Sequence, residues 1–157
     1  MKLYVVQHGQ AIAKDVDPQR PLSERGRADV ERMASFLGGA GIRVPRILHS
    51  GKKRAEQTAA LLAGAVGSGQ PLEATSGIDP LDPTDGFTRT VNRWTEDTMV
   101  VGHLPFMGRL VSRLVVGDEA APTVAFQPGT IVCLERGEEG SWLLAWMVRP
   151  ELLADRG

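Results

Sequence analysis

The stretch that decides the fold covers residues 3–10 and reads Leu3-Tyr4-Val5-Val6-Gln7-His8-Gly9-Gln10. Its apolar beginning is typical of a buried central strand, and it stops abruptly at Gln-His-Gly. Glycine after the histidine lets the backbone turn sharply. Because chemistry gathers at the carboxyl ends of strands in open α/β sheets, His8 is the first candidate for a functional residue.

Composition predicts one soluble domain over residues 1–157. The apolar content of 42% and the charged content of 24% are ordinary for a globular protein. A net charge of -1 gives no reason to expect a nucleic-acid or membrane partner, so any attraction for an anion must be local. The single cysteine, Cys133, excludes an intrachain disulfide and lies in an apolar run typical of the core.

The sequence also lacks the usual signs of a membrane or secreted protein. No apolar run approaches the roughly 20 residues that span a bilayer. The amino terminus has no long apolar region typical of a signal peptide. We therefore expect a cytoplasmic protein; the oligomeric state is not readable from the sequence.

Apolar spacing predicts strands and helices that alternate along most of the chain. Strands are expected at 2–7, 46–49, 71–74, 98–101, 130–135 and 142–148. The first helix is expected to begin after Ser23 as N-cap and to end at Gly38, and the second covers 55–66. The spacing of Phe87, Val91 and Trp94 predicts a short third helix, and a fourth is expected after Pro105. This order predicts an α/β fold, a three-layer αβα sandwich whose mostly parallel sheet has an antiparallel edge.

Two connections stand out. The polar loop 10–21 is long for a strand-to-helix connection, and loops of that length are often functional. Residues 76–86 are rich in proline and aspartate, which predicts turns instead of a long helix.

Histidines close several of the predicted strands. His8 precedes a glycine, His103 follows one, and His49 ends the strand at 46–49. If the first and fourth strands are parallel, His8 and His103 emerge at the same edge and form a site for an anion or a metal. On paper His8, His49, His103 and a loop aspartate supply the three or four ligands that zinc needs. The spacing matches no metal motif, so we expect neither a metal nor another cofactor.

The segment after the second strand favours an anion. Residues 50–54 read Ser-Gly-Lys-Lys-Arg and lie where a helix is predicted to begin. A helix amino terminus offers free N–H donors and a positive dipole end. The segment is not a P-loop. Lys52 and Lys53 are typical of a solvated face, whereas Arg54 belongs to a larger motif.

Three ordered motifs together resemble the histidine phosphatase superfamily, the phosphoglycerate-mutase-like enzymes. They are Gln7-His8-Gly9, then Ser50-x-x-x-Arg54-Ala55-x-Gln57-Thr58, then Gly102-His103. The short chain and the segments Arg20-Pro21-Leu22-Ser23 and His103-Leu104-Pro105 resemble the SixA-type phosphohistidine phosphatases, small members without large helical insertions. The resemblance covers nearly the whole chain.

The resemblance implies a role for each matching residue. His8 would be the nucleophile that accepts the phosphoryl group, with its other ring nitrogen held by a backbone carbonyl. Arg54 would clamp phosphate oxygens with its planar fork, and His103 would donate to the phosphoryl group. Gln7, Gly9 and Arg20 would complete the phosphate-binding set.

Two positions depart from the family pattern. Gln7 replaces the family arginine, and the lost charge would slow chemistry by roughly 10–100-fold. Arg20 would compensate, with Lys52 as a weaker candidate. Gly51 replaces the family proline, from which we expect a change in loop stiffness more than in chemistry.

The family's acidic proton donor has no clear counterpart. Asp79, Asp82 and Asp85 lie before the third predicted helix, and the favoured interpretation is that they cap turns. A phosphohistidine substrate needs a dedicated acid less than an ester does, because its imidazole leaving group protonates easily.

Two functions follow. The first is a phosphatase that acts through a phosphohistidine intermediate on a phosphorylated protein, phosphohistidine above all, or on a small phosphorylated molecule. The alternative is a weakened or silent relative that binds phosphorylated partners, with Gln7 as the mark of that loss.

Overall fold

The computed structural model describes residues 1–154. The strands are β1 (Lys2–Gln7), β2 (Arg46–His49), β3 (Glu73–Ala74), β4 (Thr98–Gly102), β5 (Ile131–Arg136) and β6 (Trp142–Val148). The helices are α1 (Glu24–Gly39), α2 (Lys53–Val66), α3 (Thr84–Val91), α4 (Phe106–Val115) and a 3₁₀ turn, η1 (Pro150–Leu153). The predicted alternation of strands and helices is confirmed. The last three residues of the predicted domain, 155–157, lie outside the described residues.

All six strands form one sheet in the order β3-β2-β4-β1-β5-β6. β1 lies inside the sheet, parallel to β4 on one side and antiparallel to β5 on the other. β5 and β6 form the predicted antiparallel hairpin at one edge. The mostly parallel sheet with an antiparallel edge is therefore confirmed.

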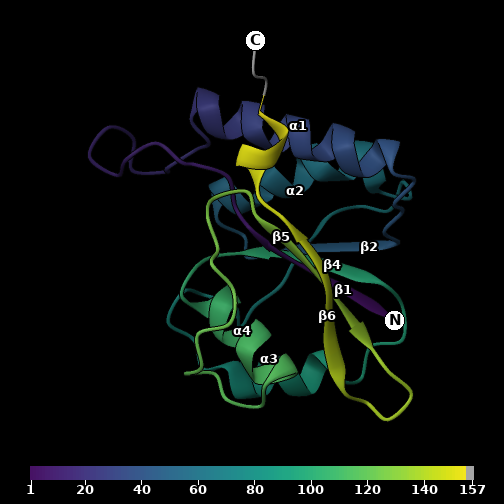
Figure 1. The fold of residues 1–157 in the computed structure, drawn as a ribbon. Helices are drawn as coiled ribbons and strands as arrows, with labels where there is room; N and C mark the ends of the chain where they lie inside the picture. The colour runs from purple at the N-terminus through teal and green to yellow at the C-terminus, as the bar shows by residue number, and fades with distance from the viewer. Residues whose placement is uncertain (155–157) are drawn as a thin grey trace.

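Helices cover both faces of the sheet, as the three-layer prediction requires. Figure 1 shows α1 and α2 on one face and α3 and α4 on the other. The alternation of side chains along β1 feeds both layers, because Tyr4 and Val6 pack with α1 and α2 while Leu3 and Val5 pack with α3 and α4. A central strand buried on both faces explains why the opening stretch reads as a continuous apolar run.

The structure corrects several predicted boundaries. β3 is shorter than the predicted 71–74, and β5 begins one residue later than predicted. α3 begins at Thr84, inside the segment predicted as turns, because Pro83 takes the N-cap position instead of interrupting the helix. Trp94 lies beyond the end of this helix, and its ring meets Phe87 edge-on with centroids 5.6 Å apart. α4 begins directly after Pro105, as predicted, with Pro105 as its N-cap.

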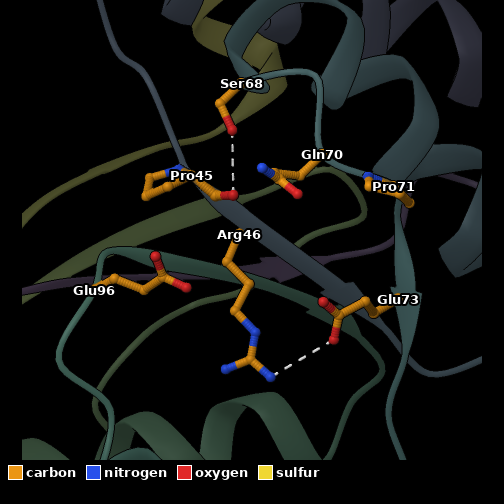
Figure 2. Close-up of a pocket in the computed structure, with 7 residues that line it drawn as sticks. All are labelled: Pro45, Arg46, Ser68, Gln70, Pro71, Glu73 and Glu96. Carbon is orange, nitrogen blue, oxygen red and sulfur yellow. Dashed lines mark hydrogen bonds and ion pairs between the residues drawn. The ribbon is translucent and has the colours of Figure 1, made fainter.

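Figure 2 shows a hollow lined by residues at the beginning of β2 and just before and within β3. Arg46 crosses it and lies 3.6 Å from a carboxylate oxygen of Glu73. Its guanidinium also stands 5.0 Å from the centre of the Trp94 ring.

Within residues 1–154, no helix is both long and apolar enough to cross a membrane.

Candidate active site

His8 stands at the carboxyl end of β1 with its ring held in one orientation. Its backbone N–H donates to the carbonyl of Gly102 at 3.0 Å, which extends the pairing with β4 by one residue. The ring Nδ1 lies 2.7 Å from the carbonyl oxygen of Gly9. A carbonyl only accepts hydrogen bonds, so Nδ1 carries the proton and Nε2 keeps its lone pair. The expected backbone partner of the ring is present.

His103 follows β4, the parallel neighbour of β1, so the two imidazoles lie side by side. Their ring centroids are 4.9 Å apart and their planes are tilted by 51°. Nε2 of His103 lies 2.6 Å from the hydroxyl of Ser50, whereas its buried Nδ1 has no hydrogen-bond partner among the described residues. The partnership with Ser50 was not predicted from the sequence, although Ser50 belongs to the second motif.

Arg54 lies in the first turn of α2, and Thr58 ties this turn to the backbone beside His8. The Thr58 hydroxyl donates to the carbonyl of Arg54 at 2.8 Å and accepts from the N–H of Gly9 at 3.0 Å. Nε of Arg54 is buried and has no hydrogen-bond partner among the described residues. The N–H of Gly9 is thus bonded to Thr58 and its carbonyl to the His8 ring. Gly9 positions the site and does not offer this N–H to a phosphate.

Loop 10–21 brings a further cation toward the two histidines. Figure 1 shows the loop projecting from the body of the molecule. Its base is closed by a 2.8 Å bond from the N–H of Ile12 to the carbonyl of Pro21. Arg20 takes a left-handed backbone conformation with φ 48°, and its Nε donates to the carbonyl of Ile12 at 3.1 Å. Gln57, another motif residue, accepts from the N–H of Leu22 at 2.8 Å and so anchors the end of the loop to α2.

Gln7 is buried, with 8% of its surface exposed. Its side-chain oxygen has no partner among the described residues. Its backbone is fixed by hydrogen bonds with Thr130 and Gly129. The charge of the family arginine is therefore absent at this position, and any replacement must come from another residue.

The comparisons with known proteins decide the family. The model of the histidine phosphatase superfamily (branch 1) matches residues 3–82, which include His8, Arg20 and Arg54. The chain belongs to the histidine phosphatase superfamily. The phosphohistidine phosphatase SixA of Escherichia coli is 26% identical over 155 residues, which cover 96% of this chain and 94% of that protein.

Solved structures agree with this membership. The structure of SixA complexed with tungstate aligns with a TM-score of 0.87 at 25% identity, and the match covers 98% of this chain and 100% of that one. A phosphoserine phosphatase of Entamoeba histolytica in complex with 3-phosphoglyceric acid aligns with a TM-score of 0.73 at 14% identity, covering 98% and 99% of the two chains. At that identity the second likeness shows the fold alone. The predicted SixA-type resemblance is confirmed.

His8 and His103 are both held neutral. Burial lowers the pKa of His8 to about 4; the Gly9 carbonyl opposes this shift, whereas the charges of Arg54 and Arg20 add to it. Burial also lowers the pKa of His103 to about 3, with contributions from His8, Arg54, Lys52 and Arg20. The charge of Arg20 contributes to the lowered pKa of both rings.

Arg54 and Arg20 also act on each other. Burial, and then the charge of Arg20, lower the pKa of Arg54 from its ordinary value. An arginine remains a cation despite such a shift. The two guanidinium groups repel each other, and the two imidazoles beside them are neutral. A bound anion would therefore stabilise this site.

The candidate acids have other partners. The Asp79 carboxylate lies 4.0 Å from Nζ of Lys52. The Asp82 carboxylate accepts from the N–H of Asp79 at 2.9 Å, and Asp85 lies 3.4 Å from a guanidinium nitrogen of Arg113. Among the residues described, none of these carboxylates bonds to His8, Arg54 or His103. These contacts support the interpretation of the aspartates as turn and helix partners.

The hypothetical zinc set is not assembled. His49 turns its Nδ1 to the N–H of Gly51 at 3.0 Å instead of joining the other two histidines. In the described part of the chain, no group of three histidine, cysteine, aspartate or glutamate side chains is placed to hold a metal ion.

Gly51 differs from the family proline in more than stiffness. Its φ is +89°, whereas the proline ring fixes φ near -65°. The turn of this chain is therefore closed to proline, and the expected change in stiffness is a change in backbone geometry.

Proposed function

We propose that this protein is a phosphatase that hydrolyses phosphohistidine on a protein, through a phosphohistidine intermediate on His8. The observation that carries the proposal is the 2.7 Å contact between Nδ1 of His8 and the Gly9 carbonyl, which leaves Nε2 as the nucleophile. Membership of the superfamily and the likeness to SixA support the same chemistry.

The first step transfers the phosphoryl group to the protein. The lone pair of His8 Nε2 attacks phosphorus while the P–N bond of the substrate breaks, and the leaving imidazole nitrogen takes a proton from water. Arg54, Arg20 and the His103 ring surround the phosphoryl oxygens. This arrangement suits phosphoryl transfer because catalysis depends mainly on position and positive charge.

The second step restores the enzyme. Water attacks the phosphorus of phosphorylated His8, the bond from phosphorus to Nε2 breaks, and its electron pair returns to the ring. Inorganic phosphate leaves, and the proton of the attacking water passes to phosphate or solvent. Throughout, Nδ1 keeps its proton on the Gly9 carbonyl, so the same nitrogen is regenerated for the next cycle.

The site favours a leaving group that protonates without help. The lowered pKa values keep His8 and His103 neutral at pH 7, and among the described residues the carboxylates of Asp79, Asp82 and Asp85 contact Lys52, the N–H of Asp79 and Arg113 instead of the two histidines. An alkyl alcohol needs a general acid to leave, whereas imidazole is readily protonated by water. Phosphohistidine therefore fits this site better than phosphoserine.

The proposal is tested with two phosphorylated proteins. We expect phosphate release from a carrier protein phosphorylated on histidine, and release at least 100-fold slower from a phosphoserine peptide. The His8→Asn variant is the blank for non-enzymatic loss of the labile phosphoryl group. The absence of release from the carrier and from aryl phosphates alike would refute phosphatase activity.

The depressed pKa values predict activity that persists into acid. Because protonation of Nε2 removes the nucleophile, and kcat/KM reports groups of the free enzyme, its acid limb should lie near pH 4 and not near 6.5. An acid-stable aryl phosphate is the substrate for this measurement, with a correction for its own ionisation. An acid limb near pH 6.5 would show that His8 is not desolvated.

Arg20 is predicted to supply the charge that Gln7 lacks. We expect Arg20→Gln to lower kcat/KM by about 10–100-fold, the loss typical of one charge-assisted hydrogen bond. Gln7→Arg alone should raise kcat/KM less than about 3-fold, because the phosphoryl group already has its cation. In the double variant, Gln7→Arg should recover most of the kcat/KM that Arg20→Gln loses. A gain from Gln7→Arg well above about 10-fold would instead indicate a weakened site.

A further inference from the structure

A buried histidine outside the proposed mechanism holds the turn between β2 and α2. His49 is the last residue of β2 and is 5% exposed. Its carbonyl accepts from the N–H of Thr75 at 2.8 Å, so its backbone is fixed to the neighbouring strand. From this anchored position its Nδ1 accepts the N–H of Gly51 at 3.0 Å.

Gly51 is required by the backbone of this turn. Its φ of +89° is a conformation that side chains of L-residues rarely adopt, while the space where a Cβ would stand is open. Conformation, not packing, therefore selects glycine. Proline, the residue of the family motif, has neither this φ nor the N–H that His49 binds. His49 and Gly51 thus form one structural unit.

The turn leads to His103 through Ser50. The Ser50 hydroxyl oxygen accepts from the N–H of Lys52 at 3.3 Å and lies 2.6 Å from Nε2 of His103. This hydrogen bond joins the His103 ring to the turn, with one ring nitrogen as donor or acceptor according to the tautomer.

We propose that His49 is a positioning residue for His103. By holding the N–H of Gly51, it fixes the place of Ser50, and Ser50 sets the tautomer and the orientation of the His103 ring. The inference rests on the proposed function only in assigning His103 to the phosphoryl group. It explains why this chain can dispense with the proline of the family motif.

A matched pair of variants separates the acceptor from the bulk of His49. In His49→Asn, Oδ1 replaces Nδ1 at the same number of bonds from the backbone, whereas in His49→Gln the amide lies one bond further. We expect kcat to fall about 10-fold in His49→Gln, with KM within about 2-fold of that of the unaltered protein. His49→Asn should retain most of the original kcat. Equal losses in the two variants would overturn the proposal.

The Ser50→Ala background tests whether His49 acts through the turn. Without the Ser50 hydroxyl that contacts His103, asparagine and glutamine at position 49 should give the same kcat. A difference that persists in this background would show that His49 acts by another route, and would overturn the proposal.

Nitrogen-15 spectra of the imidazoles give a readout that needs no turnover. We expect a single dominant tautomer of His103 in the unaltered protein and in His49→Asn, and mixed tautomers in His49→Gln and in Ser50→Ala. Unchanged His103 signals in a folded His49→Gln variant would refute the proposal. If no substrate is hydrolysed at all, the proposed function fails while these spectra still decide the role of His49.

Discussion

Substitution of His8 by asparagine should reduce turnover of a phosphorylated histidine carrier by about 10⁴-fold or more, a loss typical of removing a nucleophile. Asparagine keeps a polar group on the same backbone but has no ring nitrogen at the Nε2 position. The turn after β1 stays fixed, because the N–H of Gly9 still donates to Thr58. The measurement is single-turnover release of labelled phosphate.

The same variant separates attack from binding. Arg54, Arg20 and His103 remain in place, so the affinity for inorganic phosphate should change only a few-fold. In the unaltered enzyme, rapid quenching should trap one phosphoryl group in an acid-labile, alkali-stable linkage. Label that persists in His8→Asn would assign the nucleophile to another residue and contradict the proposed mechanism.

Local sequence signals predicted the elements that carry the site. The apolar run before His8 predicted β1, and Ser23 was predicted as the N-cap of α1. The structure confirms both, with the Ser23 hydroxyl accepting from the N–H of Gly26 at 3.0 Å. Such features depend on neighbours in the chain, so composition and spacing reveal them.

Contacts between distant residues escaped the same reasoning. Ser50 and His103 are 53 residues apart, and no periodicity links a hydroxyl to an imidazole at that separation. Gly9 and Thr58 are 49 residues apart, and their bond could not be read from the sequence either. Side-chain partners of this kind are set by sheet order, which placed β4 between β2 and β1.

Gln7 and Gly51 show the limit of a family pattern. Each was recognised from the sequence as a departure, but its consequence depended on the surroundings. For the charge missing at Gln7, Arg20 is the proposed replacement, and it lies in a loop whose base is closed by the bond from Ile12 to Pro21. The proline missing at position 51 is matched by a hydrogen bond from Gly51 to His49.

Substitution of Arg54 by lysine should lower kcat/KM by about 100-fold, although the charge is kept. A guanidinium presents two parallel donors to a phosphoryl group, and lysine replaces them with a flexible point charge. Arg54→Gln removes the charge as well and should cost about 10³-fold, since charge-assisted bonds contribute roughly 1.5–3 kcal/mol each. Arg27→Lys, on the exposed side of α1 and 3.9 Å from Glu31, is the matched control and should leave kcat/KM unchanged.

The pH dependence of kcat/KM distinguishes the loss of the Arg54 charge from a folding defect, because the two affect the acid limb differently. The charge of Arg54 contributes to the lowered pKa of both His8 and His103. Its removal in Arg54→Gln should therefore raise both pKa values and move the acid limb of kcat/KM to higher pH, whereas Arg54→Lys should leave that limb near its original position. An acid limb that stays fixed in Arg54→Gln would place Arg54 too far from His8 to act on the phosphoryl group that His8 receives.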